Sequence, residues 1–199
     1  MPDRDTDENL LRRARAGEED AFLLIYTRHR VAMYRFACRL LGSEAIAEDI
    51  THDCFLSLFK HPERFDATRG VSLRTYLFAA VHNLAMKQFR RAGRETWIDE
   101  TTTDESLKSH DAPEPLSRLI EAELAAAVRA AVENLPALQR EVLILFEFED
   151  LSLAEIAVVV DAEVNTVKSR LARGRAGLRR LLLPYLERRE ELVAAAWEK

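Results

Sequence analysis

The cationic side chains of segment 164–183 are the clearest sign of chemistry in the sequence, because no acidic residue interrupts them. Stepping about 100° per residue from Val167 places Leu171, Gly174 and Leu178 on one side, which predicts a helix with an inward apolar stripe. The polar residues at the start of this helix have groups that can bind DNA phosphates and base edges; they are Asn165, Thr166, Lys168, Ser169, Arg170 and Arg173.

A second, shorter helix is predicted directly before the basic one. Ser152 and Glu155 have the spacing of a capping box, in which each side chain bonds the other residue's backbone amide. A turn over 161–164 follows, and Asn165 is the expected cap of the basic helix. A short helix, a tight turn and a basic helix indicate a helix-turn-helix, whose second helix enters the major groove. The alternative is a solvated helix of an ordinary bundle, but such a helix usually mixes charges of both signs.

The predicted helix from about residue 73 to 91 carries a second polar face. Leu77, Val81 and Ala85 lie on its apolar side. An aromatic ring, an amide and several cations project nearly opposite: Tyr76, Asn83, Lys87, Arg90 and Arg94. A ring can stack on an unpaired base while the cations hold the backbone, which suits single-stranded nucleic acid. Taken alone, the pattern fits an ordinary surface equally well.

A third surface is acidic and lies on the predicted helix 44–60. Glu48, Asp49 and Asp53 are interleaved with apolar residues, which by default indicates one packed face and one solvated face. His52 is expected to be a surface residue, because no second His or Cys stands at metal-ligand spacing.

Composition excludes several classes of protein. The chain has 199 residues, of which 48% are hydrophobic and 32% charged, enough for one large or two small globular domains. Neither a membrane span nor a signal peptide is expected. Cys38 and Cys54 are expected to be reduced core thiols of a cytoplasmic protein. With no phosphate loop, catalytic triad or zinc spacing, we expect no catalytic residue, no metal and no cofactor.

Charge is segregated along the chain although its net value is only −5. An acidic stretch, 95–115, separates the two basic segments, and its composition predicts a flexible tether. The expected fold is all-α, with two small helical domains joined by this linker. The predicted divisions are a helical bundle over 8–95, the linker over 96–115, the helix-turn-helix domain over 116–184, and a short helical tail over 185–199 that follows a break at Pro184.

Four stretches together resemble a known family. They are residues 17–37, the acidic segment 47–55, the stretch from Phe65-Asp66 to Arg90-Arg91, and the run from Leu135-Pro136 to Leu171. In order and spacing they resemble a bacterial sigma factor of the extracytoplasmic-function (ECF) group, the compact members of the sigma-70 family with regions 2 and 4 only. The resemblance departs from the family pattern at Asp161 and Asn165, where glycine is frequent, at Tyr76, where tryptophan is frequent, and at His52, where glutamine is frequent.

The resemblance implies roles that the residue pattern alone does not. The acidic helix would bind core RNA polymerase at the β′ clamp helices, with the β subunit as a further contact, through Glu48, Asp49, His52, Asp53, Phe55 and Leu56. The −10 promoter element would be read by Arg74, Tyr76, Asn83, Lys87, Arg90 and Arg91. The −35 element would be read by the polar residues at the start of the basic helix. An anti-sigma factor is a further expected partner, and no membrane insertion is expected.

Two other functions remain open. A stand-alone helix-turn-helix regulator would bind DNA without polymerase. A helical adaptor that binds acidic proteins would show no sequence-selective DNA binding even with core polymerase present.

Overall fold

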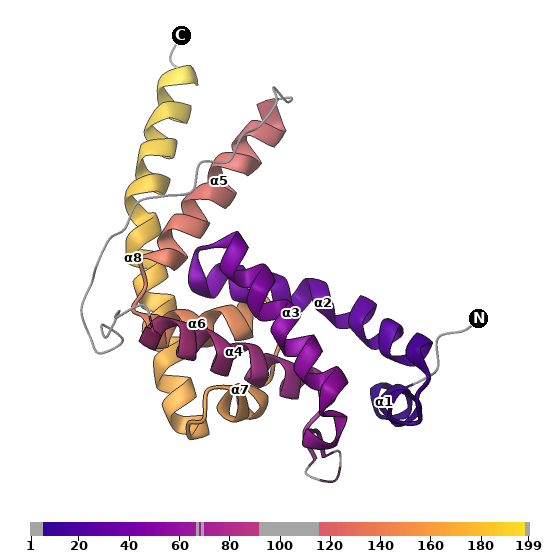
Figure 1. The fold of residues 1–199 in the computed structure, drawn as a ribbon. Helices are drawn as coiled ribbons and strands as arrows, with labels where there is room; N and C mark the ends of the chain where they lie inside the picture. Colours follow the sequence, from indigo (N-terminus) through magenta and orange to yellow (C-terminus); the bar gives the residue numbers. More distant parts are fainter. Residues whose placement is uncertain (1–5, 67, 69, 92–115, 198–199) are drawn as a thin grey trace.

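The fold is seen in a computed structural model that describes residues 6–66, 68, 70–91 and 116–197. Within those ranges every regular element is a helix, which confirms the all-α prediction. The elements are α1 Asp7–Arg15, α2 Glu19–Leu41, α3 Glu44–Lys60, the 3-10 turn η1 Pro62–Arg64, α4 Leu73–Arg91, α5 Leu116–Glu133, α6 Ala137–Glu147, α7 Leu153–Val159 and α8 Val164–Trp197 (Figure 1).

Local chemistry sets the helix ends of the N-terminal half, α1 to α4. Thr6 caps α1 by accepting a hydrogen bond from the Asn9 amide. Gly42 ends α2 at a φ of 67°, a left-handed conformation that glycine adopts without steric cost. Ser43 then caps α3 by accepting a hydrogen bond from the Ile46 amide. The short connection makes α2 and α3 antiparallel neighbours (Figure 1).

The C-terminal half, α5 to α8, contains the predicted helix-turn-helix. The capping box at the start of α7 is present, with both the Ser152 and the Glu155 side chains bonded to backbone amides. Asp161 sits in the turn at a φ of 48°. Glycine adopts this left-handed conformation most readily, and Asp is one of the few other residues that tolerate it.

Two predicted helix boundaries are wrong. Asn165 does not cap the basic helix, because α8 already begins at Val164. Pro184 does not end the helix, since α8 continues through it to Trp197. The missing amide of a proline removes one helical hydrogen bond, yet the helix around it persists. The expected separate tail is therefore the end of α8. The acidic linker lies outside the described residues.

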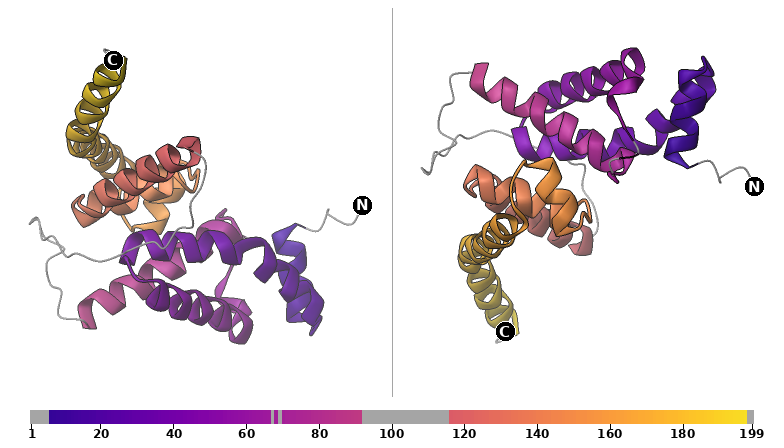
Figure 2. Two further views of the ribbon diagram at one scale, coloured as in Figure 1. Left: turned by 90° about the horizontal axis from the view of Figure 1, so that it is seen from above. Right: turned by 90° about the horizontal axis from the view of Figure 1, so that it is seen from below.

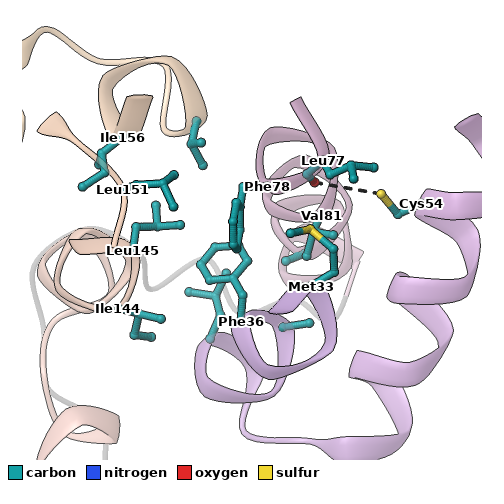
Figure 3. Close-up of a cluster of buried hydrophobic side chains, with 14 of the residues drawn as sticks. Met33, Phe36, Cys54, Leu77, Phe78, Val81, Ile144, Leu145, Leu151 and Ile156 are labelled. Carbon is teal, nitrogen blue, oxygen red and sulfur yellow. Dashed lines mark hydrogen bonds between the residues drawn. The ribbon is translucent and has the colours of Figure 1, made fainter. Parts of the chain in front are cut away.

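The two halves pack against each other. α4 lies against α7, and α2 against α6, and both views in Figure 2 show the halves side by side with the end of α8 projecting away. Buried residues of both halves form one hydrophobic cluster, in which Phe36 and Phe78 of the N-terminal half meet Leu145 and Ile156 of the C-terminal half (Figure 3).

Candidate nucleic-acid interface

The start of α8 presents an exposed polar surface. Asn165, Lys168, Ser169 and Arg173 are exposed, and Thr166 is half-buried. Val167 and Leu171 point inward and are buried, as the predicted stripe requires. The free amides and the positive dipole end of a helix N-terminus attract phosphate. On this surface they lie beside two exposed cations, Lys168 and Arg173.

Arg170 differs from its neighbours on α8. Its Nη1 lies 3.3 Å from Oε1 of Glu141, a carboxylate of α6 whose side chain is 2% exposed. A second group reaches the same carboxylate, since Nε2 of His82 on α4 lies 3.0 Å from Oε2. Arg170 was predicted to bind the −35 element; in the structure its side chain is 22% exposed and pairs with this buried carboxylate.

The polar face of α4 is exposed over its C-terminal part. Asn83, Lys87 and Arg90 lie at positions i, i+4 and i+7 and are all exposed, as predicted. Tyr76 is half-buried, with its ring edge-on to Phe65 at 5.5 Å between centroids. Burial raises the pKa of its hydroxyl. The Arg91 side chain and Arg94 lie outside the described part of the structure.

Arg74 is the predicted −10 residue that the structure places elsewhere. Its guanidinium donates to the backbone carbonyl of Glu149, in the other half of the chain. It also lies over the Phe78 ring, 5.1 Å from the centroid. Arg74 therefore contributes to the contact between the halves and not to the exposed face of Asn83 and Lys87.

The loop before α4 is held by a residue that sequence analysis missed. Arg15 of α1 donates to the carbonyl oxygens of Pro62 and Phe65, the latter at 2.7 Å. Phe65 is buried and meets Tyr76, so Arg15 braces the chain that supports the Tyr76 ring. Close to 50 residues separate these partners in sequence, and no local pattern signals the contact.

The acidic face of α3 is exposed. Glu48, Asp49, His52 and Asp53 are exposed, and Leu56 is 37% exposed beside them. Phe55 was predicted to contact polymerase, but it is 3% exposed and packs edge-on against Tyr26 with ring centroids 5.0 Å apart. Phe55 therefore packs in the core beneath α3 and is not part of its exposed face.

Phe59 extends the same face of α3 and was missed. It is 55% exposed and stands at i+3 from Leu56 and i+7 from His52, so all three lie on one side of the helix. That spacing was visible in the sequence and could have identified it. The α3 face is thus acidic at one end and apolar at the other.

Three buried polar residues were also missed, and all lie between the halves. Glu141, Glu149 and His82 are between 2% and 7% exposed. Burial raises the pKa of the Glu149 carboxyl, although Arg39, Arg35 and Arg74 attract its charge. A glutamate within the apolar run 141–146 and a histidine on the apolar side of α4 are weak signals of buried pairing.

The described residues show no sign of a metal site. No group of three or more His, Cys, Asp or Glu side chains within those ranges is placed to hold an ion. Cys54 is buried, which raises the pKa of its thiol to about 12 and keeps it protonated. No helix in the described ranges is long and apolar enough to span a membrane.

Comparison with known proteins agrees with this arrangement of two helical units. The family described as sigma-70 region 2 matches residues 25–95, and the family described as sigma-70 region 4 matches residues 125–178. The ECF RNA polymerase sigma factor SigW of Bacillus subtilis is 29% identical over 178 residues, covering 86% of this chain and 94% of SigW. The RNA polymerase sigma-H factor of Pseudomonas aeruginosa is 28% identical over 195 residues, covering 94% and 98%.

Two solved structures share the fold. One is the sigma factor RpoE of Bartonella quintana in complex with the anti-sigma factor NepR, with a TM-score of 0.64, 27% identity, and coverage of 81% of this chain and 96% of that one. The other is CnrH in complex with the cytosolic domain of CnrY, with a TM-score of 0.63, 27% identity, and coverage of 88% and 96%.

The paired regions define the class. The chain belongs to the sigma-70 family, whose members are transcription initiation factors. SigW, which is named an ECF RNA polymerase sigma factor, aligns with this chain over 94% of its own length, and the chain is a member of the ECF group.

Proposed function

We propose that this chain is a non-catalytic promoter-specificity subunit that acts with core RNA polymerase in the cytoplasm. Two relatives that are named RNA polymerase sigma factors align with this chain over nearly their whole length. The observation that carries the proposal is the separation of three exposed surfaces on one chain, each with the charge its partner requires: acidic on α3, basic on α4 and basic on α8.

The α3 face binds the polymerase core. Asp49 and Asp53 would meet cations of the β′ clamp helices, while Leu56 and Phe59 would bury apolar area beside them. Charged groups at the rim and apolar groups at the centre are the usual division of labour in a protein interface. Phe55 supports this face from within the bundle.

The two basic surfaces bind different parts of the promoter. Tyr76, Asn83, Lys87 and Arg90 suit the unpaired −10 strand, because a ring can stack on a base while the cations hold the backbone. The exposed residues at the start of α8 suit the major groove of the −35 element. Since core polymerase holds both surfaces on one promoter, modest affinity at each becomes sufficient.

An anti-sigma factor is a further proposed partner. One structural neighbour, RpoE, was determined with the anti-sigma factor NepR, and another, CnrH, was determined with the cytosolic domain of CnrY. Their shared topology with this chain supports the same kind of regulation here.

Charge reversal on α3 tests the core-binding step. The double variant Asp49→Lys, Asp53→Lys should lower affinity for purified core polymerase by about tenfold or more, because like charges then face the partner. The affinity is measured by fluorescence anisotropy of the labelled chain. Glu123→Lys, an exposed acid on α5, is the matched control and should bind as the wild type does. Equal binding by the α3 variant would rule out this face as the docking surface.

A further inference from the structure

Ala172 lies in the middle of the exposed face of α8. It follows Asn165 by seven residues and Ser169 by three, so these three side chains share one side of the helix, and all three are exposed. Val167 and Leu171 lie on the opposite side and are buried. A methyl group therefore occupies the middle of the surface that is proposed to enter the major groove.

Exposed cations lie on both sides of this middle line. At about 100° per residue, Lys168 falls on one side of it and Arg173 on the other. The two phosphate backbones border the major groove, and the base edges form its floor. A helix with cations on both flanks holds phosphates with them, so that the middle of its face, with Ser169 and Ala172, points at the bases.

The other two cations in this part of α8 are held by α6. Nη1 of Arg170 lies 3.3 Å from Oε1 of Glu141. Nη2 of Arg175 lies 2.6 Å from Oε1 of Glu147, and its guanidinium lies 4.9 Å from the centroid of the Phe146 ring. Because both guanidinium groups are bonded within the C-terminal half, neither covers the middle of the exposed face.

The Ser169 hydroxyl presents only an acceptor to a ligand. Its Oγ donates its one proton to the carbonyl oxygen of Thr166, 2.9 Å away, and the side chain is exposed. In the major groove the base-edge donors are the N6 amine of adenine and the N4 amine of cytosine, whereas guanine and thymine offer acceptors. Ser169 therefore distinguishes adenine and cytosine from the other two bases.

The Ala172 methyl group distinguishes between those two bases. Thymine, the partner of adenine, is the one standard DNA base with a methyl group in the major groove. Side chains three residues apart on a helix are about 5–6 Å apart at Cβ, and neighbouring base pairs are about 3.4 Å apart. Ser169 and Ala172 can therefore contact the same base pair or two adjacent ones.

We propose that Ser169 and Ala172 together select adenine–thymine pairs within the −35 element. Ser169 accepts a hydrogen bond from N6 of adenine, and Ala172 contacts the methyl group of thymine on the same or the adjacent base pair. The inference rests on the proposed function. It makes Ala172 a specificity-determining residue, whereas Lys168 and Arg173 supply affinity through phosphate.

A promoter library randomised over the −35 element tests the pair. Transcripts made by core polymerase and the wild-type chain should be enriched in adenine–thymine pairs at one or two adjacent positions. Ala172→Gly should lower the preference for adenine over cytosine there by about fourfold, the value of one buried methyl group. Ser169→Ala should lower the preference for adenine over guanine and thymine by about fivefold, the value of one hydrogen bond.

Two further variants accompany this test. Ala126→Gly makes the same change at an exposed position of α5, with the same cost to helix stability, and should select the same sequences as the wild type. Ala172→Ser replaces the methyl group by a polar one in a better helix former than glycine. It should also admit cytosine, which keeps the test valid if Ala172→Gly is unstable. The −10 sequences that are selected should be unchanged in every variant.

The outcomes separate this inference from the proposed function. If the wild type, Ala172→Gly and Ser169→Ala enrich the same adenine–thymine pairs equally, those pairs are selected through DNA shape and the inference is wrong. A wild-type chain that enriches no adenine–thymine position within the −35 element would overturn it as well. If the wild type supports no initiation from the library, the proposed function itself is wrong.

Discussion

Arg170 and Arg173 are three residues apart on α8, yet their side chains lie in different surroundings. Arg173 is exposed at the proposed −35 surface, whereas Arg170 is bonded to the buried carboxylate of Glu141. An exposed cation contributes to DNA affinity by releasing counterions from phosphate. A cation paired with a buried carboxylate contributes to stability, because its removal leaves that charge uncompensated.

Alanine substitution should separate these two roles. Arg173→Ala should weaken holoenzyme binding to promoter DNA and lower the slope of log affinity against log salt by about 1, with no change in thermal stability. Arg170→Ala should instead destabilise the chain by about 2 kcal/mol. Salt-dependent anisotropy and thermal denaturation measure the two effects. A stable Arg170→Ala variant with reduced DNA affinity would show that Arg170 contributes to DNA binding and not to stability.

Asp7 gives the N-terminal helix a pH-dependent anchor. Its carboxylate lies 2.5 Å from Arg28 and 2.7 Å from Nε2 of His29. Burial opposes ionisation, but the hydrogen bond and charge of His29 and those of Arg28 outweigh it, so the pKa of Asp7 is lowered from 3.8. A lowered pKa means that the folded chain binds a proton less readily than the unfolded chain.

The Asp7 contribution to stability should therefore be complete above pH 3.8 and should disappear as the pH falls through the lowered value. Asp7→Asn should cost under about 1 kcal/mol at neutral pH, since the group is partly exposed. Chemical denaturation at a series of pH values from 7 to 3 measures the difference, with exposed Glu8→Gln as control. A difference that persists unchanged at the lowest pH would contradict the assignment.

At the scale of elements, α1 supports the loop between α3 and α4. Arg15 donates to two carbonyl oxygens of that loop, and Phe65 at its end contacts Tyr76. The Tyr76 ring, proposed to stack on an unpaired base, must be held in one conformation, because ordering it on binding would cost affinity. Arg15 is thus a positioning residue that acts through Phe65.

Arg15→Ala should reduce promoter opening by about tenfold, the value expected when two hydrogen bonds are lost. The readout is permanganate reactivity of unpaired thymines in the −10 region. Core binding should not change, and Arg15→Lys should recover part of the loss. Arg12→Ala is the control on the same helix, since Arg12 bonds Asn9 within α1. Equal opening by Arg15→Ala and the wild type would show that the loop needs no brace.

Most element boundaries were predictable because local chemistry determines them. Ser43, Ser152 with Glu155, and Gly42 mark helix ends through bonds or backbone angles that involve only near neighbours in sequence. The continuation of α8 through Pro184 was not predictable, since proline normally ends a helix. The exposed faces of α3 and α4 followed from helical spacing for the same local reason.

At the scale of the whole molecule, the packing of the halves could not be predicted. Arg39 and Glu149 are 110 residues apart, and Arg74 and Glu149 are 75 apart, so no periodicity connects them. Arg74, which the family resemblance assigned to DNA, and Arg170, which charge and helical position assigned to DNA, are both half-buried and bonded to groups of other elements. Charge and helical position identify a surface, but only the tertiary fold decides which cations remain on it.

Run-off transcription from a promoter library with purified core polymerase tests the central claim most directly. With the wild-type chain, core polymerase should initiate at defined positions downstream of shared −10 and −35 sequences. Without the chain, or with the Asp49→Lys, Asp53→Lys variant, those transcripts should be absent. Identical transcripts with and without the chain would contradict a role in promoter selection.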